Sequence, residues 1–587
     1  MTPKIWWKEG VAYQIYPASF KDGNGDGLGD IPGIISKVDY LKDLGVDIVW
    51  VSPMFESPQI DMGYDISNYE AVHAPYGTVE DMQELINACH ARGMRLILDL
   101  VVNHTSDQHA WFRESRSSKT NPKRDWYIWR APRYDPLTGA RIPPTNWRSY
   151  FSGPAWEWDE ASGEYFLHLF AKEQPDLNWE SAACRQAIYD SAMRFWLDKG
   201  VDGFRVDTVN MYSKGPVAAI TDAPVVNAGV FEQPAWDLYA NGPRMHEFLR
   251  EMNDEVLRKY DTMTVGELPH TPDPAKVLQY VGAAQKQLSM VFQFDIVNVG
   301  QGASYRYEYA DWRLSELKGI VAKWQQFIQG TDGWTTAFCE NHDQGRSVTR
   351  FASDRPEYRA LSAKMLALFM CSLTGTLFIY QGQEIGMVNI PSDWPIEEYK
   401  DIEGLGYYRE IAKQTNNDPQ ALAQVVKNLS ILGRDNARTP MQWDGTLHAG
   451  FTEAEAVPWM RVNDSYTDIN VAKQLTEPDS VLKFWKDMIR FRKAHSDLLI
   501  YGAFDTFDLQ TEETFVFVKS HGEEKAVVAL NFSDSKQEVE LPGSGEFLLQ
   551  ISNYVHSENE AKVAAGGSRV TLQPWEGQLY IHHVTDT

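Results

Sequence analysis

The stretch Gly203-Phe204-Arg205-Val206-Asp207-Thr208 is a short apolar run with two charged residues near its end. Successive side chains of a β-strand point to opposite faces, so Arg205 and Asp207 share one face. A guanidinium beside a carboxylate favours the charged carboxylate, which is the form that a nucleophile needs. In isolation, such a pair is more often a structural ion pair. Whether this pair is catalytic or structural therefore depends on which residues stand at the ends of the other predicted strands.

Similar apolar, β-branched runs recur through the first five hundred residues, with helix-period segments between them. Alternating strands and helices predict a parallel sheet, and eight such repeats predict a closed (β/α)8 TIM barrel in an α/β protein. One helix is predicted after Thr78, which would cap it with Asp81 as an imperfect capping-box partner. This helix is expected to end at Gly93. A second helix is expected over residues 186–199. The eight predicted strands are 11–16, 48–52, 95–102, 203–208, 262–267, 290–295, 334–340 and 377–382.

The spacing of these strands predicts additions to the barrel. About a hundred residues separate the third and fourth strands, too many for an ordinary βα loop. From residue 504 the pattern changes to short strands, which predicts a C-terminal antiparallel β-sandwich domain. We expect a catalytic barrel over residues 1–104 and 177–503, with an insertion at about 389–451 after strand 8, an inserted subdomain over 105–176, and an all-β domain over 504–587.

Composition restricts the classes of partner. The formal net charge is −26, which disfavours nucleic acid, and no basic amphipathic stretch suggests a membrane surface. Aromatic residues make up 12% of the chain, which favours core packing over sugar binding when taken alone. Oligomeric state, monomer or homodimer, is left open.

The same sequence predicts a cytoplasmic protein. The start of the chain has no apolar signal-peptide region and no run long enough to span a membrane. A secreted protein whose leader is missing from this sequence stays open as an alternative. The four cysteines have no metal-type spacing, which predicts buried, reduced thiols.

Further polar residues follow other predicted strands. Glu267 ends the fifth strand after an apolar run, where partial desolvation raises a carboxyl pKa toward that of a general acid. His342 and Asp343 stand at the end of the seventh strand, and His104 at the end of the third. Each of these residues alone is more often structural. Their joint placement at strand ends predicts a site at the loop face of the barrel.

At this point the chain resembles the α-amylase superfamily of glycoside hydrolases, family 13. The resemblance rests on Asp99 through Asn103-His104, the Gly203–Asp207 motif, Glu267, and Asn341-His342-Asp343. It extends over nearly the whole chain. The segments 6–17, 174–179 and 438–443 are similar to the oligo-1,6-glucosidase and maltase branch, including fungal and bacterial maltase-type α-glucosidases.

The resemblance implies a role for each acid. Asp207 would be the nucleophile, Glu267 the acid and base, and Asp343 the residue that binds hydroxyls of the distorted sugar. Retention of configuration would require the first two carboxyls to lie about 5–5.5 Å apart. Asp99 would orient Arg205. The residues implied for substrate binding are Asp61, Tyr64, His104, Phe170, Gln174, Arg205, Thr208, His342 and Arg434, the last preferred over Arg438.

The loop after the first strand has oxygen ligands at alternating positions with glycines between them. This pattern suits Ca²⁺, although it lacks the final Glu of an EF-hand loop, and a plain acidic turn is the alternative. The family branch supports a structural calcium site and implies no organic cofactor. The implied ligands are Asp22, Asn24, Asp26, the Leu28 carbonyl and Asp30.

The residue after the nucleophile bears on linkage. In this branch, threonine goes with maltose-type α-1,4 enzymes and valine with α-1,6 enzymes, and Thr208 stands here. One such contact biases specificity by about 1–3 kcal/mol. The expected activity is that of a retaining exo-acting α-glucosidase on short α-glucosides, sucrose included, with transglucosylation at high sugar concentration. The segment Leu268-Pro269-His270 departs from the maltase and isomaltase pattern, so fine specificity stays open.

Three alternatives stay open. An α-1,6-specific oligo-1,6-glucosidase uses the same residues. A sucrose isomerase or transglucosylase is disfavoured because residues 305–312 lack the arginine- and aspartate-rich loop of those enzymes. A non-catalytic scaffold is disfavoured because all three acids are present.

Overall fold

The computed structural model describes residues 5–302, 305–555 and 563–583. Its centre is a sheet of eight strands in the order β13-β12-β11-β5-β2-β1-β15-β14. All eight predicted strands are confirmed, most of them with shorter ends. Their bounds are β1 Val11–Ile15, β2 Ile48–Val51, β5 Arg95–Leu100, β11 Gly203–Val206, β12 Met263–Leu268, β13 Met290–Gln293, β14 Thr336–Ala337 and β15 Thr376–Tyr380.

The sheet curls into a nearly closed barrel. Parallel ladders join neighbours from β13 around to β14, for example Val265 with Met290 and Thr336 with Thr376. The last gap is bridged by a side chain, because the Thr336 hydroxyl donates to the Val291 carbonyl at 3.1 Å. Aromatic rings fill the interior, with Phe292 4.7 Å from Phe378 between ring centroids. The barrel is therefore a packed core whose polar groups are confined to its ends.

Local sequence explains where helices begin. Thr78 caps α5 (Val79–Ala91) in a complete capping box with Asp81, so the box predicted as imperfect is fully formed. The helix expected over residues 186–199 is interrupted. It consists of α7 (Ala182–Ile188), a π-helical segment η3 (Tyr189–Arg194) and α8 (Phe195–Leu197). The 3.6-residue pattern alone gave no signal of this change.

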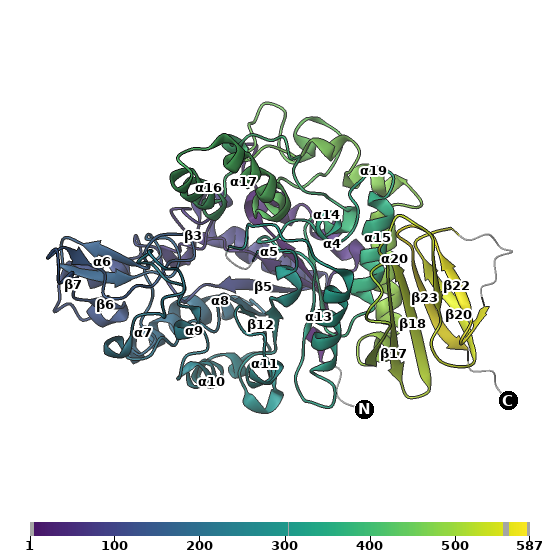
Figure 1. Ribbon diagram of the computed structural model, residues 1–587, viewed down its shortest axis with the longest axis horizontal. Helices are drawn as coiled ribbons and strands as arrows, with labels where there is room; N and C mark the ends of the chain where they lie inside the picture. Colours follow the sequence, from purple (N-terminus) through teal and green to yellow (C-terminus); the bar gives the residue numbers. More distant parts are fainter. Residues whose placement is uncertain (1–4, 303–304, 556–562, 584–587) are drawn as a thin grey trace.

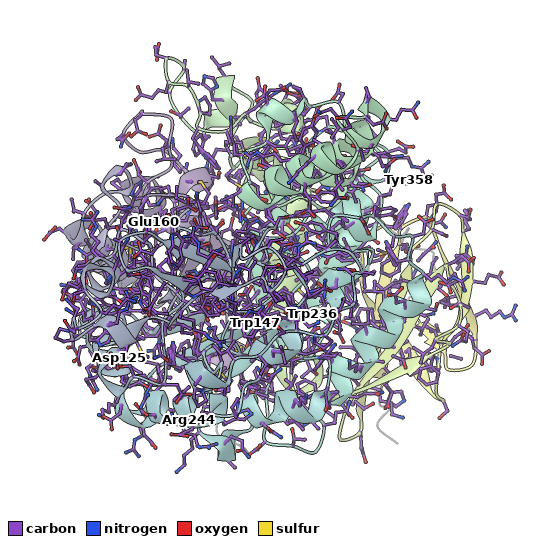
Figure 2. The ribbon with its side chains drawn as sticks, turned by 60° about the vertical axis from the view of Figure 1, so that its left-hand side comes forward. Asp125, Trp147, Glu160, Trp236, Arg244 and Tyr358 are labelled. Carbon is purple, nitrogen blue, oxygen red and sulfur yellow. The ribbon has the colours of Figure 1, made fainter. Side chains whose placement is uncertain are left out.

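The segment between β5 and β11 forms a separate lobe on the left of Figure 1. It contains α6 (Ala110–Ser117) and the small sheet of β6 (Trp129–Arg130), β10 (Glu164–Leu167) and β9 (Trp156–Asp159). Its apolar cluster also takes in Ile220, Ala235 and Tyr239, which belong to the loop after β11. Trp147 of the lobe and Trp236 of that loop are labelled in Figure 2. The sequence did not predict that this second loop joins the lobe.

After β15 the chain forms the antiparallel helices α16 (Ile402–Gln414) and α17 (Pro419–Leu432), seen in green at the top of Figure 1. These helices occupy the predicted insertion after strand 8. Like the lobe, they rise from the end of the barrel where the strands terminate. Both additions thus wall the same face of the barrel, as expected of loops that follow barrel strands.

The C-terminal domain packs a six-stranded sheet against a two-stranded one. Alternation along β17 (Thr514–His521) explains the packing. Phe515 and Phe517 belong to the main core, with Phe515 6.0 Å from Phe369 of α15 (Arg359–Cys371), whereas Val516 and Val518 belong to a second cluster with Leu572 of the small sheet. The other strands are β16 (Ala503–Phe507), β18 (Glu524–Asn531), β19 (Gln537–Glu540), β20 (Glu546–Ser552), β21 (Val563–Ala565), β22 (Arg569–Leu572) and β23 (Gly577–His583).

The sequence pattern of this domain predicts a single strand over residues 570–581, and the structure corrects this prediction. The run over residues 570–581 is divided into β22 and β23, which lie in different sheets. Trp575 between them has a φ of 55°, a left-handed conformation that interrupts an extended strand.

Two predictions on composition can be compared with the structure. The four cysteines Cys89, Cys184, Cys339 and Cys371 are buried and free, as expected. Among the described residues, no helix has both the length and the apolar character needed to cross a membrane.

Candidate active site

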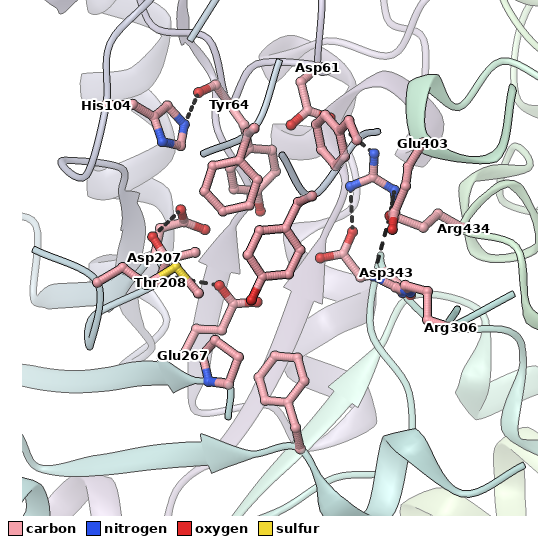
Figure 3. Close-up of a pocket in the computed structure, with 16 residues that line it drawn as sticks. Asp61, Tyr64, His104, Asp207, Thr208, Glu267, Arg306, Asp343, Glu403 and Arg434 are labelled. Carbon is pink, nitrogen blue, oxygen red and sulfur yellow. Dashed lines mark hydrogen bonds and ion pairs between the residues drawn. The ribbon is translucent and has the colours of Figure 1, made fainter. Parts of the chain in front are cut away.

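Two of the three predicted acids, Asp207 and Glu267, lie near each other at the loop end of the barrel (Figure 3), where both contact one arginine. Asp207 directly follows β11, and Glu267 is the penultimate residue of the neighbouring strand β12. Arg205 Nη1 is hydrogen-bonded to Asp207 Oδ1, and Arg205 Nη2 lies 2.8 Å from Glu267 Oε1. The two carboxyls are thus held side by side on adjacent nitrogens of one guanidinium, as their strand-end positions predict.

Burial dominates the acidity of this pair. Arg205 Nη1 also contacts Asp99 Oδ1 at 2.8 Å, so three carboxyls share one cation. Burial raises the pKa of Asp207 to about 6, although Arg205 lowers it. Burial raises the pKa of Glu267 to about 7, against the same opposing charge. The sequence argument that Arg205 favours the ionised form of Asp207 was right about its direction, but burial outweighs it.

Thr208 ties the two acids together. Its backbone N–H donates to Glu267 Oε2 at 3.0 Å, and its hydroxyl donates to Asp207 Oδ2 at 3.2 Å. To do so the residue has a φ of 37°, which is strained for a β-branched side chain. Thr208 therefore positions both carboxyls as well as lining the pocket.

Asp343 lies across the pocket from this pair, beside the Arg434 guanidinium (Figure 3) and that of Arg438 behind it. Arg438 Nη2 is 2.9 Å and Arg434 Nη1 3.4 Å from Asp343 Oδ1. Burial alone raises a carboxyl pKa, but here the nearby positive charges outweigh it and hold the pKa of Asp343 well below its usual range. Asp343 is therefore a permanent anion facing two carboxyls that titrate near neutrality.

The two arginines differ in position. Arg434 lines the pocket, and its Nη2 contacts Asp61 Oδ1 at 3.1 Å. Arg438 lies behind it, with Nε donating to the His342 carbonyl at 3.0 Å. Both arginines bind Asp343, but Arg434 is the one that reaches the cavity, as preferred from the sequence.

The remaining predicted residues are joined by hydrogen bonds around the pocket. Gln174 Nε2 lies 3.2 Å from both Asp61 Oδ2 and His104 Nε2. His342 Nε2 is 2.6 Å from the Tyr64 hydroxyl, and burial lowers the pKa of His342 to about 3, so its ring is neutral. The predicted residues that line the cavity are Asp61, Tyr64, His104, Phe170, Asp207, Thr208, Glu267, Asp343 and Arg434. Arg205, Gln174 and His342 hold these residues from behind.

Seven lining residues were not predicted from the sequence. Met211, Pro269 and Phe294 come shortly after barrel strands, so their positions in strand-end loops could have predicted them. The other four are Tyr150 and Phe151 of the lobe, Arg306 of a long loop and Glu403 of α16. Nothing in their local sequence marks them, because only the fold brings them to the cavity of about 100 Å³.

In the predicted calcium loop, acidic side chains accept hydrogen bonds from the backbone of the same loop. Asp22 accepts from the backbone of Asn24 and Gly25 and from Gly27, and Asp26 accepts from Leu28 N at 2.8 Å. Asp30 instead caps α3 (Ile31–Ile35). Across the described part of the chain, no group of three or more His, Cys, Asp or Glu is placed to hold a metal. A calcium loop would draw further oxygens from Asn24 and the Leu28 carbonyl, so the predicted site remains a prediction.

Comparisons with known proteins agree with this geometry. Residues 14–502 match the model of the α-amylase catalytic domain. The chain is 50% identical to an α-glucosidase of Candida albicans, with 99% of this chain and 100% of that protein covered. It is 46% identical to an oligo-1,6-glucosidase of Saccharomyces cerevisiae, with 99% and 98% covered. An isomaltulose synthase structure from Protaminobacter rubrum matches with a TM-score of 0.91 at 39% identity, covering 99% of this chain and 100% of that one.

The barrel, with its paired carboxyls and a third acid across a closed pocket, defines a glycoside hydrolase. The chain belongs to the α-amylase family, glycoside hydrolase family 13, and its relatives named α-glucosidase or oligo-1,6-glucosidase align over nearly its whole length.

Proposed function

We propose that this enzyme is a retaining, exo-acting α-glucosidase that releases α-glucose from the non-reducing end of short α-glucosides. The observation that carries the proposal is the placement of Asp207 and Glu267 on one guanidinium, with Asp343 opposite. Asp207 would attack the anomeric carbon and form a β-glucosyl ester. Glu267 would protonate the leaving oxygen and then activate water, which restores the α configuration.

A hydrogen-bonded wall of the pocket supports exo action. Asp61, Gln174 and His104 are linked by hydrogen bonds, and this wall would stop a longer chain from continuing in that direction. Arg434, Asp61 and Asp343 offer charged partners for hydroxyls of the terminal glucose. A terminal sugar therefore fits, with its aglycone directed toward the mouth of the cavity.

Thr208 favours a preference for the α-1,4 linkage of maltose, and we expect sucrose to be a further substrate. The relatives include both α-glucosidases and oligo-1,6-glucosidases, so an α-1,6 preference is the second candidate. Hydrolysis is favoured over sucrose isomerisation, because the curated hydrolases are 46–50% identical and the isomaltulose synthase 39%. Transglucosylation follows when a sugar hydroxyl replaces water in the second step.

The test combines product and rate measurements. Initial rates on maltose, isomaltose and sucrose, with the first-formed anomer followed by NMR, should give α-glucose and the highest kcat/KM on maltose. Glucose of the β configuration would exclude retention, and a preference for isomaltose would exclude α-1,4 specificity.

We further propose that the loop over residues 22–30 binds Ca²⁺ and stabilises the first βα connection. Its support is an all-oxygen donor set in one tight loop that packs against Thr452, whose hydroxyl donates to Asp22 Oδ2 at 2.5 Å. Oxygen donors of this kind suit a hard cation, whose role would be structural.

A further inference from the structure

An aromatic stack leads from the catalytic pocket toward the surface. Phe170 and Tyr150 both line the pocket and are stacked, with centroids 5.1 Å apart and an interplanar angle of 15°. The Tyr150 hydroxyl is hydrogen-bonded to His270 Nε2. The His270 ring is parallel to the indole of Trp236, at 5.1 Å and 3°. The stack thus joins the catalytic pocket to Trp236.

His270 holds the middle of this stack in an unusual backbone conformation. Its φ is 52°, in the left-handed region that a side chain rarely occupies without support. It directly follows Pro269 of the pocket wall.

Trp236 is unusual among the tryptophans. All 20 of them lie in the part of the chain that the structure describes, and Trp236, at 39%, is the one in the exposed class. Fully buried residues such as Trp50 and Trp196 explain the aromatic content as core packing. That explanation does not account for Trp236, which begins the short helix α9 (Trp236–Tyr239).

Trp236 forms part of a second hollow, which we call the outer groove. One wall contains Val226, Val230 and Trp236, and the other contains Tyr305, Tyr407 and Glu410. Tyr305 and Tyr407 are themselves stacked, 4.4 Å apart at 13°. The groove has a volume of about 640 Å³, larger than the catalytic pocket of about 100 Å³.

The outer groove is connected to the segment that carries the acid Glu267. Glu267 is the acid that meets the leaving oxygen, and His270 follows it by three residues on the same connection. Tyr150 places its ring between the pocket and His270. The rings of Tyr150 and His270 therefore link the lining of the catalytic pocket to the Trp236 indole.

We propose that the outer groove binds a distal sugar unit of an α-gluco-oligosaccharide, with the Trp236 indole as its stacking platform. This inference rests on the proposed α-glucosidase function and extends its substrate class to trisaccharides and longer chains. The apolar face of a pyranose packs on a flat aromatic ring, while its hydroxyls meet polar groups. Arg148 and Glu410, paired at 2.7 Å, supply such groups at the rim.

The test compares chain lengths in Trp236→Ala. We expect kcat/KM on maltotriose to fall about tenfold, the effect of losing one stacking contact, while kcat/KM on maltose stays within about twofold of the parent. Tyr134→Ala is the matched control, because Tyr134 is an exposed aromatic residue, 64% accessible, on the lobe and outside the groove. It should leave both substrates unchanged.

Two further variants keep the test informative if the alanine variant misfolds. Trp236→Phe keeps an aromatic face and should retain most of the maltotriose activity, whereas Trp236→Leu, apolar but not flat, should lose it. Equal losses of kcat/KM on maltose and maltotriose, or no loss on either, would overturn the proposal that the outer groove binds a distal sugar. Failure of the parent enzyme to cleave any α-glucoside would instead reject the proposed function.

Discussion

At the scale of single residues, the chemistry depends on charge balance around Arg205. Asp99, Asp207 and Glu267 all contact this one guanidinium, and all three are buried. Full ionisation of the three would leave two uncompensated charges in a low-dielectric site, which is unfavourable. A proton is therefore retained in the cluster near neutral pH, and Glu267, which has the higher pKa of the catalytic pair, is its expected holder.

This charge balance predicts a narrow pH optimum. Asp207 must be ionised to attack, so kcat/KM rises as the pH passes its pKa of about 6. Glu267 must be protonated to assist the leaving group, so kcat/KM falls as the pH passes about 7. Because the two groups interact, the two limbs of the pH profile report apparent pKa values of the pair and not of either residue alone. A plot of log kcat/KM against pH should peak between about 6 and 7. A plateau extending beyond pH 8 would contradict this assignment.

Thr208 gives a prediction on linkage. In Thr208→Val the backbone N–H to Glu267 stays, and the hydrogen bond to Asp207 Oδ2 is lost. Valine is also β-branched, so the strain at this position is little changed. We expect the kcat/KM ratio of isomaltose to maltose to rise about tenfold, as one contact in a pocket allows. Thr208→Ser, which keeps the hydroxyl, is the control and should leave the ratio near that of the parent.

At the scale of elements, strand ends were predictable and long loops were not. A barrel strand is a short apolar run, and its first polar residue faces the loop end, so Asp207 and Glu267 could be found from the pattern. Arg306 and Glu403 had no such signal. Their carboxylate–guanidinium contact of 3.3 Å depends on how residues 305–308 meet α16, which no local pattern encodes. The same holds for the π-helical segment within the helix expected over residues 186–199.

The loop over residues 22–30 gives a prediction at this scale. If it binds Ca²⁺, added calcium should raise the thermal midpoint of the chelator-treated protein by a few degrees, because a ligand that binds only the folded state stabilises it. Asp26→Asn should abolish this response. Asp135→Asn is the control, since Asp135 also closes an acidic turn by accepting from Leu137 N and Thr138 N. An unchanged midpoint with and without calcium would identify the loop as a plain acidic turn.

At the scale of the whole molecule, the C-terminal domain is joined to the barrel by β17. Its period-two alternation predicted a half-buried strand, but not that Phe515, Phe517 and Lys519 would share the face toward the barrel. Lys519 is fully buried there and is hydrogen-bonded to the Thr374 hydroxyl. Burial lowers the pKa of Lys519 well below its usual value. Sequence alone gives no reason to bury a lysine, because the partner surface comes from another domain.

Lys519 predicts how stability depends on pH. Its pKa is lower in the folded than in the unfolded state, so the unfolded chain binds the extra proton and stability rises with pH between the two values. Lys519→Met should therefore flatten the rise of the thermal midpoint between pH 7 and 9. Lys525→Met, on the exposed end of the neighbouring strand β18, is the control and should keep the slope of the parent. If the thermal midpoint of Lys519→Met rises with pH as steeply as that of the parent, a group other than Lys519 takes up the proton on unfolding.

The most direct test of the catalytic assignment is to trap the glucosyl-enzyme. A fluorinated α-glucosyl fluoride, whose covalent intermediate hydrolyses slowly, should add a single fluoroglucosyl group to the protein. Mass spectrometry of the digested protein should find that group on Asp207. A label on any other side chain, or rapid turnover in Asp207→Asn, would contradict the convergence of Asp207, Glu267 and Asp343 on one anomeric carbon.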